Sequence, residues 1–205
     1  MKLAADGPTA LRADAIRLLG MFPDKAPPVS FFLDLTANPS AEIRKAAVGA
    51  LQSQTQRLTR EDVTRLLGSE HADVRRTALD LSFSLPQLQA VDLIADCVLD
   101  DNLEVRTTAI RYAGLRGIAG WQQILRQSLK DPNLQIQTAT VETLLARRDP
   151  ECRQMLVDFL ATCQNAALAE SIRQQLGRIP VPPLYGPRQV LPRPAPTRPP
   201  LPRPQ

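Results

Sequence analysis

One motif recurs along this chain at a nearly fixed spacing. Branched aliphatic residues stand 31 positions apart at Ile43, Val74, Val105 and Ile136, and a further copy, displaced by one position, is centred on Leu11. We call these five residues the anchors. The segments around them are DGPTALRADAIRLLG, NPSAEIRKAAVGAL, SEHADVRRTALDLS, DDNLEVRTTAIRYAG and DPNLQIQTATVETLL, with a weaker sixth copy, TCQNAALAESIRQQLG. A unit this short cannot bury an apolar face alone, so we expect the copies to stack into an array.

Each copy has the pattern of a helix that follows a polar turn. The residue five positions before the anchor is short and polar, which suits the start of a helix: Asp6, Asn38, Ser69, Asp100, Asp131 and, in the weak copy, Thr162. Small or aliphatic residues predominate four, five and eight positions after the anchor, where they share one helical stripe with it. Alanine within this stripe lets neighbouring helices approach closely.

A second amphipathic segment lies between successive copies. These segments are SFFLDLTA, REDVTRLLGS, LQAVDLIADCVLD, AGWQQILRQSLK and ECRQMLVDFLATC. No segment alternates between apolar and polar residues with a period of two over a useful length, so no sheet is expected. We therefore predict an all-α fold, an α-solenoid of stacked helical hairpins over residues 1–177. Each repeat pairs an inner helix, which is the recurring copy, with an outer helix, which is the segment between copies. The array has about five and a half repeats, because the first copy lacks an outer helix before it.

The turns NPSAEIRKAA, SEHADVRRTA, DDNLEVRTTA and DPNLQIQTAT resemble HEAT-like repeats, in the short form first associated with bilin lyases. The resemblance covers residues 6–177 and implies a HEAT-like or armadillo-like superhelix. It says little about function, because the family includes scaffolds, adaptors, lyases and a few DNA-repair enzymes.

An arginine directly follows four of the anchors, and Gln137 replaces it after the fifth: the four are Arg12, Arg44, Arg75 and Arg106. The resemblance implies that these arginines bond the polar turns of their own or an adjacent repeat, with Asp100, Asp101 and Asp131 as acceptors. A basic ladder for an anionic ligand is the alternative interpretation.

The first copy does not look like a polar cap. Terminal repeats of an array normally carry a polar outer face, but this copy contains apolar residues throughout: Leu11, Leu18, Leu19, Met21 and Phe22. We expect a partner, a self-contact or a preceding segment at this end of the array.

The composition changes sharply at Arg178. Eleven of the 19 prolines lie in the last 26 residues, and residues 178–205 hold five arginines and no acid. The preceding residues therefore carry 20 basic and 21 acidic side chains, so the net charge of +4 comes from the tail. We predict a second region, 178–205, that is a disordered, extended Pro/Arg-rich tail.

Three interpretations of the tail remain open. It is a solubilising linker, a ligand for a proline-recognition module, or a weak, salt-dependent nucleic-acid contact. In the second case Arg193, Pro196 and Pro199 are the candidate protein-binding residues, because three-residue spacing places them on one face of a polyproline II helix. The arginines recur every five residues, so they spiral around such a helix and form no stripe.

Catalytic and cofactor motifs are missing from the sequence. It contains no Gly-rich phosphate loop, G-x-S-x-G, C-x-x-C or H-E-x-x-H pattern. The single histidine, His71, follows Glu70 in a turn, where capping or solvation is the simpler role than metal binding. We predict no enzyme, cofactor, metal or small-molecule substrate. Two features argue against nucleic-acid binding. The helices of the recurring copies carry little net charge, and the single tryptophan, Trp121, lies in a segment between copies.

The three cysteines do not form a disulfide framework. Cys152 and Cys163 fall within one predicted helix, roughly 16 Å apart, which is too far to bridge. We expect them, with Cys97, to be small buried side chains in a reducing compartment, the cytoplasm. The apolar stretches are too short for a secretory signal or a membrane span, so a soluble protein is expected.

The expected function is a non-enzymatic scaffold or adaptor that binds a protein partner with the concave face of the solenoid. Positions two and six after the anchors should line that face. The candidates are Arg17, Lys45, Arg76, Asp80, Arg111 and Glu142. Two alternatives stay open: an enzyme subunit or chaperone of the bilin-lyase type, which rests on resemblance alone, and the C-terminal part of a larger HEAT-repeat regulator.

Overall fold

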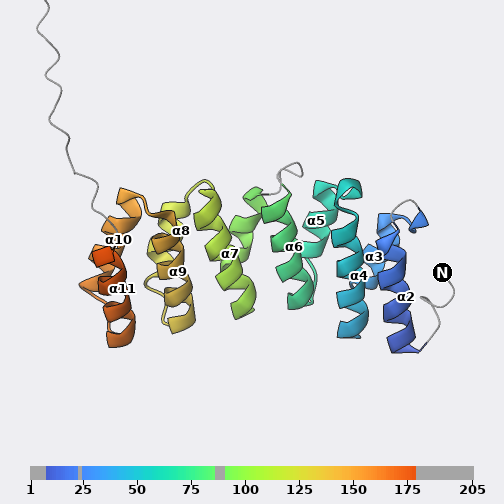
Figure 1. Cartoon of the computed structure of the whole chain (residues 1–205), viewed down its shortest axis with the longest axis horizontal. Helices are drawn as coiled ribbons and strands as arrows, with labels where there is room; N and C mark the ends of the chain where they lie inside the picture. The colour runs from blue at the N-terminus through green and yellow to red at the C-terminus, as the bar shows by residue number, and fades with distance from the viewer. Residues whose placement is uncertain (1–7, 23–24, 86–90, 179–205) are drawn as a thin grey trace, which may run out of the picture.

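A computed structural model describes residues 8–22, 25–85 and 91–178 of the chain. All regular secondary structure in these ranges is helical, in a single row of helical pairs (Figure 1). The elements are α2 (Thr9–Met21), α3 (Val29–Leu35), α4 (Ala41–Ser53), η2 (Thr55–Arg57), α5 (Arg60–Leu67), α6 (Ala72–Ser84), η4 (Val91–Leu99), α7 (Leu103–Arg116), α8 (Trp121–Ser128), α9 (Leu134–Arg147), α10 (Pro150–Leu160) and α11 (Ala166–Arg178).

The helices form two layers. Six long helices stand side by side in sequence order, and the shorter elements between them form a second layer behind (Figure 1). The long helices are the recurring copies of the sequence: α2, α4, α6, α7, α9 and α11. The predicted α-solenoid of stacked hairpins is therefore confirmed for the described residues.

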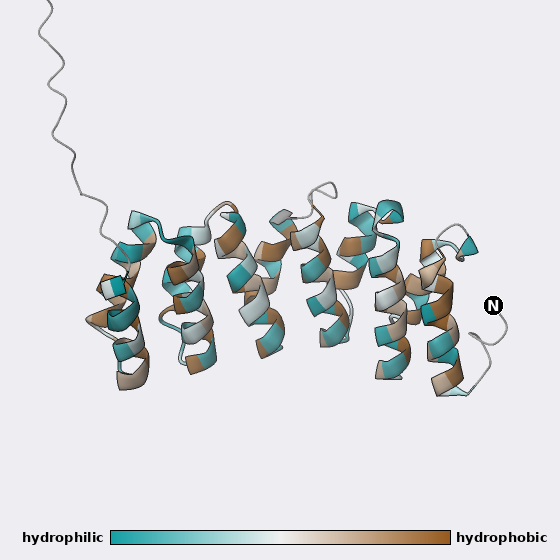
Figure 2. Cartoon of the chain, in the orientation of Figure 1, coloured by the Kyte–Doolittle hydropathy of each residue, from teal (hydrophilic) through white to brown (hydrophobic). Residues whose placement is uncertain are grey.

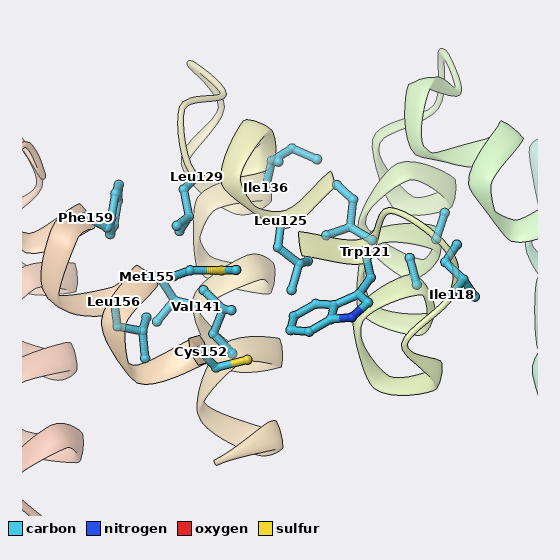
Figure 3. Close-up of a cluster of buried hydrophobic side chains, with 14 of the residues drawn as sticks. Ile118, Trp121, Leu125, Leu129, Ile136, Val141, Cys152, Met155, Leu156 and Phe159 are labelled. Carbon is cyan, nitrogen blue, oxygen red and sulfur yellow. The ribbon is translucent and has the colours of Figure 1, made fainter. Parts of the chain in front are cut away.

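The core lies between the layers and between successive units. The anchors from Ile43 to Ile136 are buried, as are the residues four positions after them, such as Ala47 and Ala109. Apolar and polar residues alternate along the helices, so each helix keeps a polar side for solvent (Figure 2). In the C-terminal half Leu125, Val141 and Met155 converge from three helices, α8, α9 and α10 (Figure 3).

Two glycines allow neighbouring long helices to pack backbone against side chain. A Cβ atom at Gly20 of α2 would lie 2.6 Å from Cα of Ala50 in α4. A Cβ at Gly114 of α7 would lie 2.4 Å from Cγ2 of Thr143 in α9. Non-bonded carbon atoms essentially never lie this close together, so both positions require glycine for the close approach of the helices.

The polar turns have the same hydrogen bonds in four successive repeats. The side chain five positions before each anchor accepts a hydrogen bond from the backbone N–H two residues later. This corrects the expected role of these side chains, since they close the turn ahead of the helix and do not cap the helix itself. The cap is the next polar position, where Asn102 and Asn133 accept from the first helical N–H groups.

The arginines that follow the anchors connect these turns. Nη1 of Arg44, Arg75 and Arg106 donates to two successive backbone carbonyls of its own turn, at 2.6 to 3.2 Å. Arg75 also reaches the next repeat, where it lies 2.6 Å from both Asp100 and Asp101. Arg44 reaches Asp73 in the same way, at 3.1 Å. We call these three arginines the rungs. The role that the resemblance implied is confirmed for Arg75, with Asp100 and Asp101 as its acceptors, and for the bonds of all three to their own turns. Asp131 is not an acceptor of a rung, since its carboxylate accepts from the backbone N–H of Asn133.

The structure corrects three details at the C-terminal end. The sixth copy is shifted by one residue, because Asn165 caps α11 and Leu168 takes the anchor position, so Thr162 does not begin the helix. Helix α10 ends at Leu160, so Cys163 lies in the following turn and not in the helix of Cys152. Cys163 is half-buried, whereas Cys97 and Cys152 are buried.

Two further expectations need correction. The segment over Val91–Leu99 forms a 3-10 helix and not an α-helix. The anchor of the first copy, Leu11, is 49% exposed, because no described element covers that side of α2. Leu18, Met21 and Phe22 are also exposed, as expected for an end without a polar cap.

Candidate protein-interaction surface

The six candidate residues of the solenoid all lie on long helices. Arg17, Lys45, Arg76, Arg111 and Glu142 are exposed, and Asp80 is half-buried. Arg193, Pro196 and Pro199 fall outside the described residues. Those on α4, α6, α7 and α9 belong to one surface, which we call the long-helix face. Arg17, on α2, forms its ion pair within its own helix, with Asp14 at 2.6 Å, and we do not include it in this face.

Charges on the long-helix face are paired between adjacent helices. Arg111 of α7 lies 3.4 Å from Glu142 of α9, and Arg76 of α6 lies 3.4 Å from Glu104 of α7. Each of these side chains is at least 45% exposed, so each pair contributes only about 0–1 kcal/mol to stability. The pairing alternates positive and negative charge along the face, and it does not produce the continuous basic track that a duplex requires.

An aromatic pair, which the repeat pattern did not single out, lies on the same face. Phe83 of α6 and Tyr112 of α7 stack with ring centroids 4.1 Å apart, and the guanidinium of Arg116 lies 4.5 Å from the Phe83 centroid. The Tyr112 hydroxyl donates to Asp80 at 2.6 Å. Burial and the bond to this carboxylate raise the Tyr112 pKa to about 12, so the phenol stays protonated. The two rings stand 29 residues apart in adjacent copies, at positions that are not equivalent in the 31-residue repeat, so the spacing gave no signal for the pair.

A shallow hollow lies between α7 and α9. Its volume is about 360 Å³, and its lining combines the Arg111–Glu142 pair with small polar and apolar groups: Thr107, Leu134, Gln135, Thr138 and Ala139. Leu134 is 46% exposed. The hollow thus offers a charge of each sign, two hydroxyls, an amide and the apolar side chains of Leu134 and Ala139, which is a surface that suits an extended peptide.

A larger hollow, of about 620 Å³, lies at the polar turns between the fifth and sixth repeats. It is formed by the ends of α8 and α10 and the beginnings of α9 and α11. Its lining residues are Leu129, Lys130, Asp131, Pro132, Leu134, Gln137, Phe159, Thr162, Cys163, Gln164 and Asn165. Sequence reasoning did not predict it, although Gln137, where a rung arginine is missing, marks the place.

The Arg75–Asp100 pair and the two buried cysteines have shifted pKa values. Hydrogen bonds from Arg75 lower the pKa of Asp100, and the same contact raises the pKa of Arg75. Burial raises the thiol pKa of Cys97 to about 11 and that of Cys152 to about 12. These shifts favour the ionised form of the Arg75–Asp100 pair and the protonated form of the two thiols.

The described ranges contain no cluster of three or more potential metal ligands. His71 stands at the first position before α6, where its side chain makes no capping hydrogen bond and its backbone N–H donates to Ser69 Oγ. Within the same ranges no helix is both long enough and apolar enough to cross a membrane.

Comparison with known proteins was made by sequence and by structure. No protein-family model matches the chain, and no curated protein matches by sequence. Solved structures do match: YibA of E. coli has a TM-score of 0.57 and 16% identity, covering 86% of this chain and 81% of that one. A TOG domain of crescerin has a TM-score of 0.54 and 13% identity, covering 88% and 89%.

A designed armadillo repeat protein in complex with the peptide (KR)4 also matches, with a TM-score of 0.52, 16% identity and coverage of 86% and 96%. Identities this low bear on architecture alone. Together with the paired layers, the polar turns and the rungs, they show that this chain has the fold of a HEAT-like helical repeat protein.

Proposed function

We propose that the chain is a non-enzymatic scaffold that binds an extended segment of a protein partner along the long-helix face. The observation that supports this most directly is the line of groups that crosses α6, α7 and α9. The stacked Phe83–Tyr112 pair, the Arg111–Glu142 pair and the hollow of about 360 Å³ follow one another along successive helices. An extended peptide passes such groups in series, one repeat after another.

The aromatic pair supplies the apolar part of this surface. Half-buried aromatic rings give large contact area at little cost in side-chain entropy, and they are enriched where partners bind. The charge pairs supply orientation, because a partner with alternating signs would meet the opposite sign at each helix. One structural neighbour, the designed armadillo protein, is titled as a complex with a peptide, which supports this mode for the fold.

The proposal is tested with two matched variants of the full chain. Arg111→Glu reverses a charge on the long-helix face, and Arg126→Glu reverses one on the other layer. Both arginines are exposed, and each lies close to a glutamate of the neighbouring helix in its own layer: Arg111 to Glu142 of α9 at 3.4 Å and Arg126 to Glu151 of α10 at 3.6 Å. A partner captured from lysate is purified, and its Kd is measured with each variant.

Arg111→Glu is expected to weaken binding at least tenfold, whereas Arg126→Glu leaves the Kd within twofold of the unmodified chain. Equal loss with both variants would place the contact outside the long-helix face. A partner that turns over a small molecule only in complex with the chain would contradict the non-enzymatic assignment.

A further inference from the structure

The rungs occupy the same place in three successive repeats. In each, one guanidinium nitrogen holds two backbone carbonyls of its own turn, and in two of the three the group also contacts a carboxylate of the next repeat. The rungs of Arg44 and Arg75 are 11% and 13% exposed, so their guanidinium groups fill the space between neighbouring turns. A guanidinium is therefore the group that this turn geometry accommodates.

The fifth repeat has the same turn without the guanidinium. Gln137 stands at the rung position, and its Nε2 donates to the carbonyl of Asp131 at 2.9 Å. In the earlier repeats the next carbonyl, that of Pro39, Glu70 or Asp101, receives a second hydrogen bond from the rung. Its counterpart, the carbonyl of Pro132, receives none from the described residues. The shorter glutamine also makes no hydrogen bond to the described part of the sixth repeat.

The hollow of about 620 Å³ opens where the missing guanidinium would stand. Asp131, Pro132 and Gln137 line it on one side, and residues 162–165 of the next turn line it on the other. Phe159 and the exposed Leu134 add an apolar wall. Lys130 offsets the charge of Asp131, so recognition depends on the placement of the acceptors and not on net charge. A planar guanidinium, with five N–H donors, matches adjacent carbonyl and carboxylate oxygens.

We propose that this hollow binds an arginine of the chain's own C-terminal segment, residues 179–205, which completes the series of rungs from outside the repeat. This segment contains the arginines 188, 193, 198 and 203, without any acidic residue, and each one has a proline directly before or after it. The apolar wall of the hollow accommodates those prolines. The inference does not rest on the proposed scaffold function, because the hollow lies at the turn edge of the solenoid and shares only Leu134 with the hollow of the long-helix face.

The segment is long enough to reach the hollow. Helix α11 has 13 residues and so spans about 20 Å, and the hollow lies beside its first residues, at Gln164 and Asn165. Arg188 follows Arg178 by ten positions in the sequence. An extended chain of that length covers about 31 Å, which exceeds the distance back along the helix. Tethering also gives the segment an effective concentration on the order of 1 mM at the hollow.

Cys163 provides a native reporter of occupancy. It lines the hollow and is half-buried, whereas Cys97 and Cys152 are buried with raised pKa values. In the folded full chain, N-ethylmaleimide should therefore react at Cys163 first. An arginine in the hollow would shield this thiol. If the contact has a Kd of about 0.1 mM, tethering fills about nine-tenths of the molecules and slows the reaction about tenfold.

The experiment compares the labelling rate of Cys163 in the full chain and in two variants. In one, the arginines 188, 193, 198 and 203 are all replaced by glutamine. In the other they are replaced by lysine, which keeps the charge and removes the planar group. The glutamine variant is expected to react about tenfold faster, and the lysine variant to react at a rate close to that of the glutamine variant. A synthetic peptide of residues 179–205, added to the glutamine variant, should restore slow labelling.

Three results would overturn the proposal. Equal rates in the unmodified chain and the glutamine variant would show that the segment does not occupy the hollow. A lysine variant that reacts as slowly as the unmodified chain would show general attraction without guanidinium recognition. Protection by the peptide alone, with no effect of the tail substitutions, would show that the hollow takes this segment only from a second copy of the chain and not from its own chain. Unchanged protection of Cys97 and Cys152 verifies that each variant remains folded.

Discussion

Replacing Arg75 with methionine should weaken the junction between α6 and α7 more than any exposed ion pair could. The side chains of Arg75 and Asp100 are only 13% and 9% exposed, and two oxygens of Asp100 receive hydrogen bonds at 2.6 and 2.7 Å. Removing one partner of a buried pair costs about 3–5 kcal/mol, and Arg75 also supports the carbonyls of Ser69 and Glu70. Partial solvent access lowers the expected loss to about 2–4 kcal/mol.

Urea unfolding measures this loss directly. With an m-value of about 2 kcal/mol/M, the midpoint should fall by about 1–2 M. The matched control is Arg126→Met, whose pair with Glu151 is 62% and 46% exposed and should change stability by less than about 1 kcal/mol. The combined substitution Arg75→Met with Asp100→Asn should recover part of the loss, because it removes the uncompensated carboxylate.

Acid titration gives an independent test of the same pair. Arg75 lowers the pKa of Asp100 in the folded state, so the pair stabilises the fold above the unfolded pKa of about 3.9. That stability is lost as the pH falls through the lower, folded pKa. The difference in unfolding free energy between the unmodified chain and Arg75→Met should therefore shrink below about pH 4. If the unfolding free energies of the two proteins differ by less than about 0.5 kcal/mol at pH 7, which is roughly one-tenth of the stability of a small domain, the reasoning is refuted.

Other substitutions test the packing and the long-helix face. Gly114→Ala should cost about 1–3 kcal/mol in urea unfolding, since its Cβ meets Thr143, whereas Gly49→Ala, with open space around it, should stabilise α4 by about 0.5–1 kcal/mol. Val105→Asp buries an unpaired carboxylate, costs roughly 3 kcal/mol or more, and should split the calorimetric transition into two. Tyr112→Phe keeps the stack and loses the bond to Asp80, for a cost of about 0.5–1.5 kcal/mol by thermal melting.

Most of the fold could be predicted from the repeats in the sequence. A 31-residue spacing with one apolar stripe predicted the long helices, and the resemblance to HEAT-like repeats implied the role of the arginines that follow four of the five anchors. The long helices depend on contacts within one unit or between neighbours, so a local pattern is sufficient to indicate them. The 3-10 geometry of Val91–Leu99 was not predictable, because periodicity does not separate a tight helix from an α-helix over nine residues.

The candidate surface was predictable in position but not in chemistry. The spacing placed Arg111 and Glu142 on exposed positions, and only the structure shows that they pair across two helices. The Phe83–Tyr112 stack depends on two rotamers meeting between repeats, which spacing alone does not specify. The hollow at Gln137 arises from a missing side chain, and a search for motifs that are present does not reveal an absence.

The rungs also have an evolutionary consequence. Arg75 binds the carbonyls of its own turn and the acidic residues of the turn that follows, and Arg44 binds its own turn and Asp73, in the first turn of helix α6 in the next repeat. The second and third units thus each carry an arginine that contacts a carboxylate of the following unit, whereas Arg106 and Gln137 bond only to their own turns among the described residues. Duplication of the third unit would place Arg75 before a copy of Asp73, the carboxylate that Arg44 already contacts. Such a duplication lengthens the chain with a junction whose parts are already present, whereas an insertion of a few residues within a unit changes its spacing to both neighbours.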